Sequence, residues 1–324
     1  MSVHSPARSI RFARGRAHRI RPARSRRSRP VRSWRRHGRK AQVSAIATIF
    51  GLLLVVTFIA NYLSTTLPQQ MDVNDINHDL LVQNEVGRAA ALLEAGAAHA
   101  AVGTELTQPI VLGSVGLPPF AAPDGGVVSG DPSGSSEKVT FGIASASAPS
   151  GVLSLESQGG AFLVQLRNIY APPAEAAYNY GAVVFAQQGG TAFVEDAPPI
   201  TVTGTAAQIF LPIFSNSLGA EAGLGTAILG FQLTSVFTEK FPSGGYTLVS
   251  GSIQVVVTTP FAAAWLSYIN SQTALAGDAT CLGVGSACTG PFLFNGPLGI
   301  VTITLPATIT SVTLQVATYA ISLD

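Results

Sequence analysis

The chain has 324 residues and a formal net charge of +2, but its charges are segregated along the sequence. Residues 1–40 hold fourteen arginines and one lysine with no carboxylate, whereas the remainder holds four cations against all seventeen carboxylates. These counts exclude a uniformly basic protein, because the first part carries +15 and the rest −13. About 260 residues follow Tyr62, which is enough chain to bury a substantial core.

Residues 1–41 form a basic segment with the composition of disordered chain, because arginine, serine and proline dominate and aliphatic side chains are scarce. Its charges are explained by three alternatives: orientation of a following membrane segment, contact with nucleic acid through arginine and Trp34, or a gene start placed too far upstream. A flank that orients a membrane segment accounts for the same residues. The sequence therefore does not favour a nucleic-acid partner.

The next segment, Val43 to Tyr62, contains no charged residue and is rich in Ile, Leu, Val and Phe. About 20 such residues in a helix rise roughly 30 Å, the thickness of a bilayer core. The sequence predicts a transmembrane helix over about residues 43–63. Basic flanks stay in the cytoplasm, so we expect the N-terminus inside and the C-terminus outside. The segment is too long for an ordinary secretory signal, and no A-x-A cleavage site follows it.

Helical periodicity continues past Tyr62 to about Ala100, which predicts one long N-terminal helix over residues 42–100. Pro68 is expected to kink or interrupt it. The apolar positions of the second half recur at helix-like intervals and predict an amphipathic helix; they are Val73, Ile76, Leu80, Val82, Val86, Ala89 and Leu93.

Three aspartates, Asp72, Asp75 and Asp79, recur at helical spacing beside His78. Their oxygens could hold a divalent cation such as calcium. The favoured interpretation is a solvated polar face just outside the membrane, since acids are stabilised near the start of a helical segment after Pro68. The sequence therefore predicts no metal site.

From about Pro109 the periodicity changes to two, and short β-type runs alternate with clusters of Gly, Pro and Ser. Residues 101–324 are predicted to form an extracellular, all-β, sandwich-like domain, so the fold class is α+β with a long hydrophobic N-terminal helix. The expected strands are Lys138–Ile143, Phe162–Arg167, Ala182–Gln188, Thr191–Glu195, Gln208–Phe214, Ala227–Val236, Tyr246–Thr258, Ile300–Leu305 and Thr310–Ile321.

Three further local features are expected in this region. Gly189-Gly190 predicts a hairpin turn. Residues 260–272 predict a short helix that places Phe261, Trp265 and Tyr268 on one face, with core packing as the favoured role. Residues 124–138 and 276–291 are expected to be exposed loops that carry binding specificity.

The two cysteines, Cys281 and Cys288, lie in the Gly-rich stretch "GDATCLGVGSACTG". In an exported domain this spacing predicts a local disulfide, and two free buried thiols are the alternative. A zinc site is disfavoured because there are only two cysteine ligands and no histidine nearby.

The sequence shows little that is typical of catalysis. The five histidines all precede residue 100, so the β region lacks the commonest general base and metal ligand. No G-x-S-x-G, phosphate-binding loop or G-x-G-x-x-G motif is present. We therefore expect neither an enzyme nor a bound cofactor.

The order of parts from Arg39 to Tyr62 resembles the class III signal peptide of archaeal type IV pilins: two basic residues, a small residue, Gln, then an apolar helix. The resemblance implies recognition of Arg39, Lys40 and Ala41 by a prepilin peptidase and cleavage between Ala41 and Gln42. It also implies that the retained helix self-associates in a filament core after leaving the membrane. The helix residues that would do so are Val43, Ile46, Ile49, Phe50, Leu53, Val56 and Phe58.

A looser resemblance covers about residues 160–270, where "YNYGAVVFAQQGG", "DAPPITV" and "SGSIQVVVTTPFAAAWLSYI" are similar to the extracellular β-domain of archaeal pilin-like surface proteins. Together the resemblances imply a structural or adhesive filament subunit located in the cell membrane, in an extracellular filament, or both. The alternative is an uncleaved single-pass protein with an external β sensor domain and a basic cytoplasmic tail on anionic lipid or nucleic acid.

Overall fold

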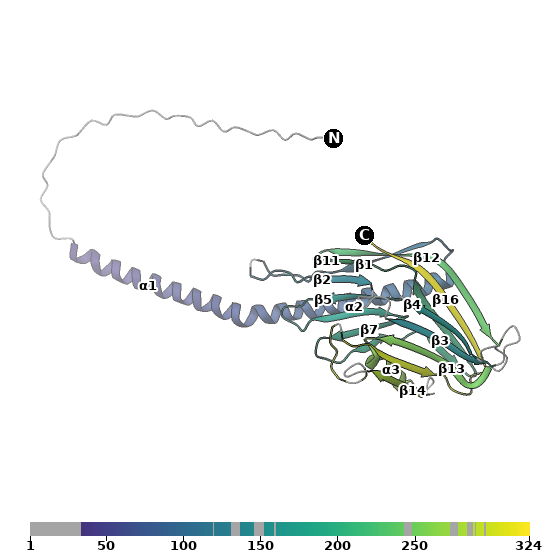
Figure 1. Cartoon of the computed structure of the whole chain (residues 1–324). Coiled ribbons are helices and arrows are strands. Elements are labelled where there is room, and N and C mark those ends of the chain that lie inside the picture. The colour runs from purple at the N-terminus through teal and green to yellow at the C-terminus, as the bar shows by residue number, and fades with distance from the viewer. Residues whose placement is uncertain are drawn as a thin grey trace, which may run out of the picture. The chain divides into compact units, whose positions relative to one another are not determined.

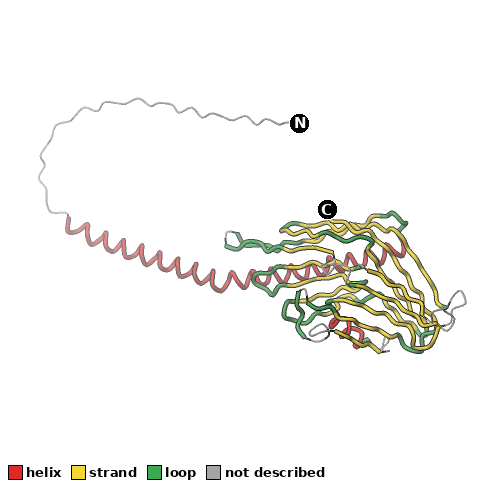
Figure 2. The backbone as a smooth tube through the Cα atoms, viewed as in Figure 1, coloured by secondary structure: helices red, strands yellow, loops and turns green. Residues whose placement is uncertain are grey.

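The computed structural model of the chain describes residues 34–118, 120–130, 137–145, 152–158, 160–242, 248–272, 278–283, 288, 290–294 and 296–324. The chain divides into two compact units, Met1–Ile59 and Ala60–Asp324. A long apolar N-terminal helix is followed by a β region with several sheets, which confirms the α+β class (Figures 1 and 2).

The N-terminal helical segment consists of α1 (Trp34–Asn61), a π-helical turn η1 (Tyr62–Thr66) and α2 (Leu67–His99). Pro68 lies in the first turn of α2, directly after the wider π turn. Proline cannot donate the usual helical hydrogen bond and crowds the preceding turn, so a change of helix type at this place confirms the predicted interruption.

The helix begins earlier than the sequence predicted. We expected disordered chain up to residue 41, but the backbone is helical from Trp34. Arg, Lys, Ala and Gln are good helix formers, so the helix of the apolar segment extends into the last basic residues. The rest of the predicted basic segment, residues 1–33, lies outside the described residues.

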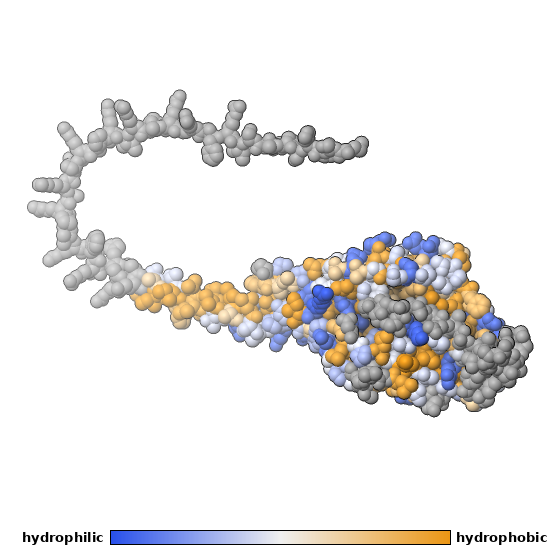
Figure 3. Space-filling model, in the orientation of Figure 1, coloured by the Kyte–Doolittle hydropathy of each residue, from blue (hydrophilic) through white to orange (hydrophobic). Residues whose placement is uncertain are grey.

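The apolar side chains of α1 are exposed. From Val43 onward the helix is long and apolar enough to cross a membrane, and its most hydrophobic stretch is unburied (Figure 3). More than half of the surface of each predicted membrane or filament residue is exposed: Val43, Ile46, Ile49, Phe50, Leu53, Val56 and Phe58.

The first of three sheets in the described part of the chain has the strand order β1-β12-β16-β10-β9. Its members are β1 (Glu105–Val111), β12 (Thr226–Phe241), β16 (Ser311–Leu323), β10 (Ala206–Phe214) and β9 (Ile200–Thr203). The pair β10–β16 is parallel, with Ala206 opposite Ser311, whereas β12 and β16 pair antiparallel.

The other two sheets are antiparallel. One has the order β11-β2-β5-β6-β7-β8, made of β11 (Ala220–Gly223), β2 (Gly126–Gly130), β5 (Ala161–Leu166), β6 (Ala174–Asn179), β7 (Ala182–Gln187) and β8 (Phe193–Asp196). The last has the order β14-β15-β13-β3-β4, made of β14 (Asp278–Gly283), β15 (Gly299–Thr304), β13 (Leu248–Thr259), β3 (Lys138–Ser145) and β4 (Val152–Gln158).

Two hydrophobic cores hold this region together. The first surrounds α2, whose Val82, Val86 and Leu93 pack with residues of the first two sheets, including Phe162 and Phe231. Because these helix side chains are fully buried, α2 belongs to the interior of the β region, as its course among the strands in Figure 1 shows.

The second core lies around α3 (Ala262–Ser271), which fulfils the predicted helix over 260–272. Phe261 and Trp265 are buried there with strands of all three sheets, and Tyr268 packs against the cluster. The favoured core-packing role of this aromatic face is confirmed.

Two predicted loops are partly wrong, because strands run through them. β2 lies within 124–138, where Val128 is fully buried, and β14 lies within 276–291. Of the other residues in these two ranges, 131–136, 276–277, 284–287 and 289 fall outside the described residues. These strands are short and rich in Gly, Ala and Ser, which are weak strand formers, so only their pairing with neighbours makes them strands.

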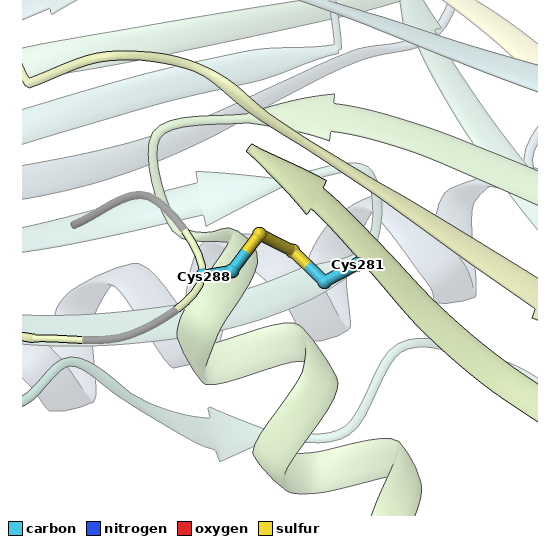
Figure 4. Close-up of a disulfide and its surroundings, with 2 residues drawn as sticks. All are labelled: Cys281 and Cys288. Atoms are coloured by element: carbon cyan, nitrogen blue, oxygen red, sulfur yellow. A yellow bond between two sulfur atoms is a disulfide. The ribbon is translucent and has the colours of Figure 1, made fainter. Parts of the chain in front are cut away.

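The predicted disulfide is present. Cys281 in β14 is bonded to Cys288, with the two Cα atoms 6.0 Å apart (Figure 4). The predicted hairpin is also present, since Gly189 lies between β7 and β8 with a φ of +76°, a left-handed conformation that favours glycine.

Candidate functional site

The four predicted processing residues, Arg39, Lys40, Ala41 and Gln42, all lie on the backbone of α1. They are consecutive and directly precede the exposed apolar part of the same helix. This order of basic, small, amide and apolar residues is the arrangement on which the sequence resemblance rests.

A second group of polar residues lies on the buried face of α2, where the sequence predicted a solvated surface. Asp75, His78, Asp79 and Glu85 are all buried, and Asp72 is partly exposed. The solvated-face prediction is wrong for Asp75 and Asp79, because α2 is enclosed by the β region. Buried carboxylates need hydrogen-bond partners, and two neighbouring loops supply them.

The loop between β5 and β6 directs three consecutive backbone amides at carboxylates. The N–H groups of Tyr170 and Ala171 donate to Oδ2 of Asp75, at 3.1 and 3.2 Å. The N–H of Ile169 donates to Oδ2 of Asp124, at 2.8 Å. Asp124 itself comes from the loop between β1 and β2. Asp75 and Asp124 therefore fix this loop against the helix, since hydrogen bonds to charged groups are among the stronger ones.

Further hydrogen bonds join α2 to β1 and to Asn168. Asn168 Nδ2 donates to both carboxylate oxygens of Asp79, at 2.9 and 3.1 Å. The His78 Nε2–H donates to the carbonyl of Val111 at 2.9 Å, and the Val111 N–H donates to Glu85 at 2.8 Å. We call Asp75, His78, Asp79, Glu85 and Asp124 the junction cluster, because they attach α2 to the strands around it.

Burial raises the pKa of three carboxyl groups in the junction cluster, Asp79, Glu85 and Asp124. It raises the pKa of Asp79 to about 6, a shift opposed by the Asn168 hydrogen bond and by His78. Burial also raises the pKa of Asp124, and the neighbouring Asp75 carboxyl raises it further. Oδ1 of Asp75, Oδ1 of Asp124 and Nδ1 of His78 are buried without a hydrogen-bond partner among the described residues.

The cluster shows no sign of metal binding. Within the described part of the chain, no group of three or more His, Cys, Asp or Glu side chains is arranged to hold a metal ion. The calcium interpretation of Asp72, Asp75 and Asp79 therefore has no structural support. Because Asp75, Glu85 and Asp124 accept backbone N–H groups and Asp79 accepts the Asn168 side-chain amide, the cluster is suited to fixing the helix.

No protein-family model, curated protein or solved structure matches this chain. The function must therefore be argued from the apolar helix, its basic flank and the junction with the β region.

Sequence reasoning missed Asp124, Asn168 and the three loop amides. No spacing rule could link Asp79 to Asn168, which lies 89 residues later in the chain. The only local signal was the pair Pro172-Pro173, which disfavours helix and marks this stretch as a loop whose amides need acceptors.

Replacing Asp75 with alanine is expected to lower the free energy of unfolding by about 2 kcal/mol, because it leaves the N–H groups of Tyr170 and Ala171 without their acceptor. Chemical denaturation of the detergent-solubilised full chain measures this. Asp72→Ala, three residues earlier on the same helix and partly exposed, is the matched control and is expected to change stability by less than about 0.5 kcal/mol. Equal effects of the two substitutions would show that Asp75 does not fix the loop between β5 and β6 against α2.

Proposed function

We propose that the chain is a type IV pilin-like subunit of an archaeal cell-surface filament, with a structural or adhesive and non-enzymatic role. The observation that carries this proposal is the sequence Arg39-Lys40-Ala41-Gln42 directly before an apolar helical stretch. All 17 residues of that stretch from 43 to 59 are exposed. Such a helix needs a bilayer or other helices around it, because exposed apolar surface on this scale is unfavourable in water.

Cleavage between Ala41 and Gln42 by a prepilin peptidase would change where the helix can lie. The cut removes all fifteen positive charges of residues 1–40, which hold the segment at the cytoplasmic face. The apolar helix can then move from lipid into a bundle of identical helices while its side chains remain shielded from water. Before the cut, the protein is a single-pass membrane protein with its C-terminus outside.

The β region supports the structural role. Its several sheets enclose two extensive cores and the region carries a disulfide, which suits a rigid scaffold outside the cell. The junction cluster attaches that scaffold to α2, so a force on the helix would be transmitted to the β region through buried hydrogen bonds.

The second candidate is an uncleaved membrane protein whose arginine-rich tail contacts anionic lipid or nucleic acid in the cytoplasm. The segregation of fifteen cations before the apolar helix favours it. The two candidates make opposite predictions for the bond between Ala41 and Gln42. This bond is cut in the first candidate and remains intact in the second.

Intact mass and N-terminal peptide mapping of protein from native cells tests the proposal. We expect a mature chain that begins at Gln42. The double variant Arg39→Ala/Lys40→Ala is expected to stay uncut while still inserting in the membrane. The matched control, Arg35→Ala/Arg36→Ala, removes the same charge farther from the bond and is expected to be cut normally. A native chain that keeps its arginines would reject the pilin proposal in favour of the tail.

A further inference from the structure

Three loops lie side by side where α2 enters the β region. They are residues 112–125 between β1 and β2, residues 167–173 between β5 and β6, and residues 224–225 between β11 and β12. Backbone hydrogen bonds join them, from Leu112 N to Gly225 O at 2.8 Å and from Arg167 N to Gly125 O at 3.2 Å. The Ile169 N–H bond to Asp124 adds a third link.

These loops also contact the helix itself. Asn74 Nδ2 donates to the carbonyl of Val115 at 3.0 Å, and the rings of Tyr62 and Phe120 meet edge to face with centroids 6.0 Å apart. Tyr62 lies at the C-terminal end of the predicted transmembrane segment, residues 43–63. The loop of residues 112–125 therefore meets the helix at Tyr62, at the end of the apolar segment, and again at Asn74, about 18 Å further along the helix.

The outer surface of these loops is apolar. Val115 is 73% exposed, Ile169 70%, Phe120 51% and Leu224 58%, and Tyr170 is also exposed. We call these five residues the collar. Large exposed apolar side chains grouped on three adjacent loops indicate a surface that is covered in the working protein.

The charges near the collar are distributed unevenly. The acidic residues of the three loops and of residues 60–80 are Asp72, Asp75, Asp79 and Asp124. Asp75, Asp79 and Asp124 are buried and accept hydrogen bonds inside, and Asp72 is partly exposed. The exposed charged residue of the loops is a cation, Arg167, in a β region whose net charge is negative.

We propose that the collar faces a lipid membrane, with Phe120 among the upper acyl chains beside Tyr62 and with the other collar residues and Arg167 toward the lipid headgroups. Aromatic, aliphatic and basic side chains together are typical of surfaces that lie at this depth. The inward orientation of the acids fits the same partner, because carboxylates would repel anionic headgroups.

The proposal rests on the proposed membrane placement of residues 43–63, but not on cleavage at Ala41 or on filament assembly. It adds a second membrane contact that fixes the height of the β region above the bilayer. The rigid attachment of the loops to α2 through the junction cluster keeps this contact in place.

Quenching of tryptophan fluorescence by brominated lipids tests the proposal on the full chain in vesicles. Every variant carries Trp34→Phe, which removes one of the two tryptophans of the chain. Trp265 is kept because its side chain is buried. Three reporters are then compared: Phe58→Trp in α1, Phe120→Trp in the collar, and Phe237→Trp. Phe237 is the matched control because it is 53% exposed, against 51% for Phe120. It also lies far from the collar, because it is eleven residues beyond Thr226, the first residue of β12 after the loop 224–225. Eleven residues of strand correspond to about 36 Å.

We expect Phe58→Trp and Phe120→Trp to lose emission in brominated vesicles and to show blue-shifted maxima, and Phe237→Trp to do neither. Quenching of the tryptophan at position 58 without quenching of the tryptophan at position 120 would overturn the collar proposal alone. No loss at Phe58 would overturn the membrane placement, and the collar contact with it. A blue shift at Phe120 without bromine quenching would mean that protein, such as a second copy, covers the collar. Circular dichroism of each variant confirms folding, and Phe120→Trp keeps an aromatic ring against Tyr62.

Discussion

Replacing Trp265 with alanine is expected to lower the free energy of unfolding by about 4 kcal/mol, the largest effect of any single substitution considered. The side chain is 1% exposed in the core around α3, so its removal leaves a large cavity. Its Nε1–H also donates to Asn179 Oδ1 at 2.9 Å, and Asn179 in turn donates to Glu137 at 3.1 Å. The substitution therefore removes both packing and one bond of a buried polar chain.

Chemical denaturation of the detergent-solubilised full chain, followed by far-ultraviolet circular dichroism, measures the effect without relying on tryptophan emission. Trp265→Phe separates the two contributions: it retains most of the ring and loses the donor, at an expected cost of about 2 kcal/mol. Phe237→Ala, on an exposed part of β12, should change stability by less than about 0.5 kcal/mol. A Trp265→Ala variant as stable as Phe237→Ala would show that α3 is not part of the core.

The helix around Trp265 shows what sequence periodicity can predict. Pro260 and the spacing of Phe261, Trp265 and Tyr268 predicted a short helix with one aromatic face, and that helix is present. The hydrogen bond from Trp265 to Asn179 was beyond prediction, because its partners lie 86 residues apart in sequence. Local periodicity specifies the face, whereas the partner depends on how the sheets come together.

The second half of the N-terminal helix shows the opposite case. The helix was predicted correctly, but Val73, Ile76 and Leu80 are exposed, whereas Asp75 and Asp79 near them are buried. The loop between β5 and β6 presents backbone N–H groups that require acceptors, and Asp75 on this face of α2 accepts two of them. Hydrophobicity alone could not reveal that polar requirement.

Several strands were missed for a related reason. β6 has the sequence AEAAYN, in which all six residues are buried, so no alternation between apolar and polar residues marks it. Alanine has a high helix propensity, so the composition of β6 does not indicate a strand. The small alanine side chains nevertheless allow neighbouring elements to approach closely. The parallel pairing of β10 with β16 was equally hidden, since it joins segments about 105 residues apart.

β6 also carries a buried carboxyl whose removal is expected to stabilise the protein. Burial raises the pKa of Glu175 to about 7, although a hydrogen bond from Gln165 opposes the shift. The folded state therefore binds this proton more tightly than the unfolded state does. The resulting stability is fully present below pH 4.5, the ordinary pKa of the group, and is lost as the pH rises through about 7. The loss is on the order of 3 kcal/mol.

Glu175→Gln keeps an oxygen acceptor for Gln165 and cannot ionise. We expect the variant to match the parent near pH 4 and to exceed its free energy of unfolding at pH 8 by up to about 3 kcal/mol. Denaturation at pH 4, 6 and 8 tests this, with Glu221→Gln on the exposed strand β11 as the matched control. Asp79, with a pKa of about 6, should leave the variant a residual decline between pH 4 and 6. Equal stability of parent and variant at pH 8 would show that Glu175 is solvated. Otherwise, Glu175 and Asp79 make the protein more stable near pH 4 than at pH 8, because burial favours the neutral form of both carboxyls.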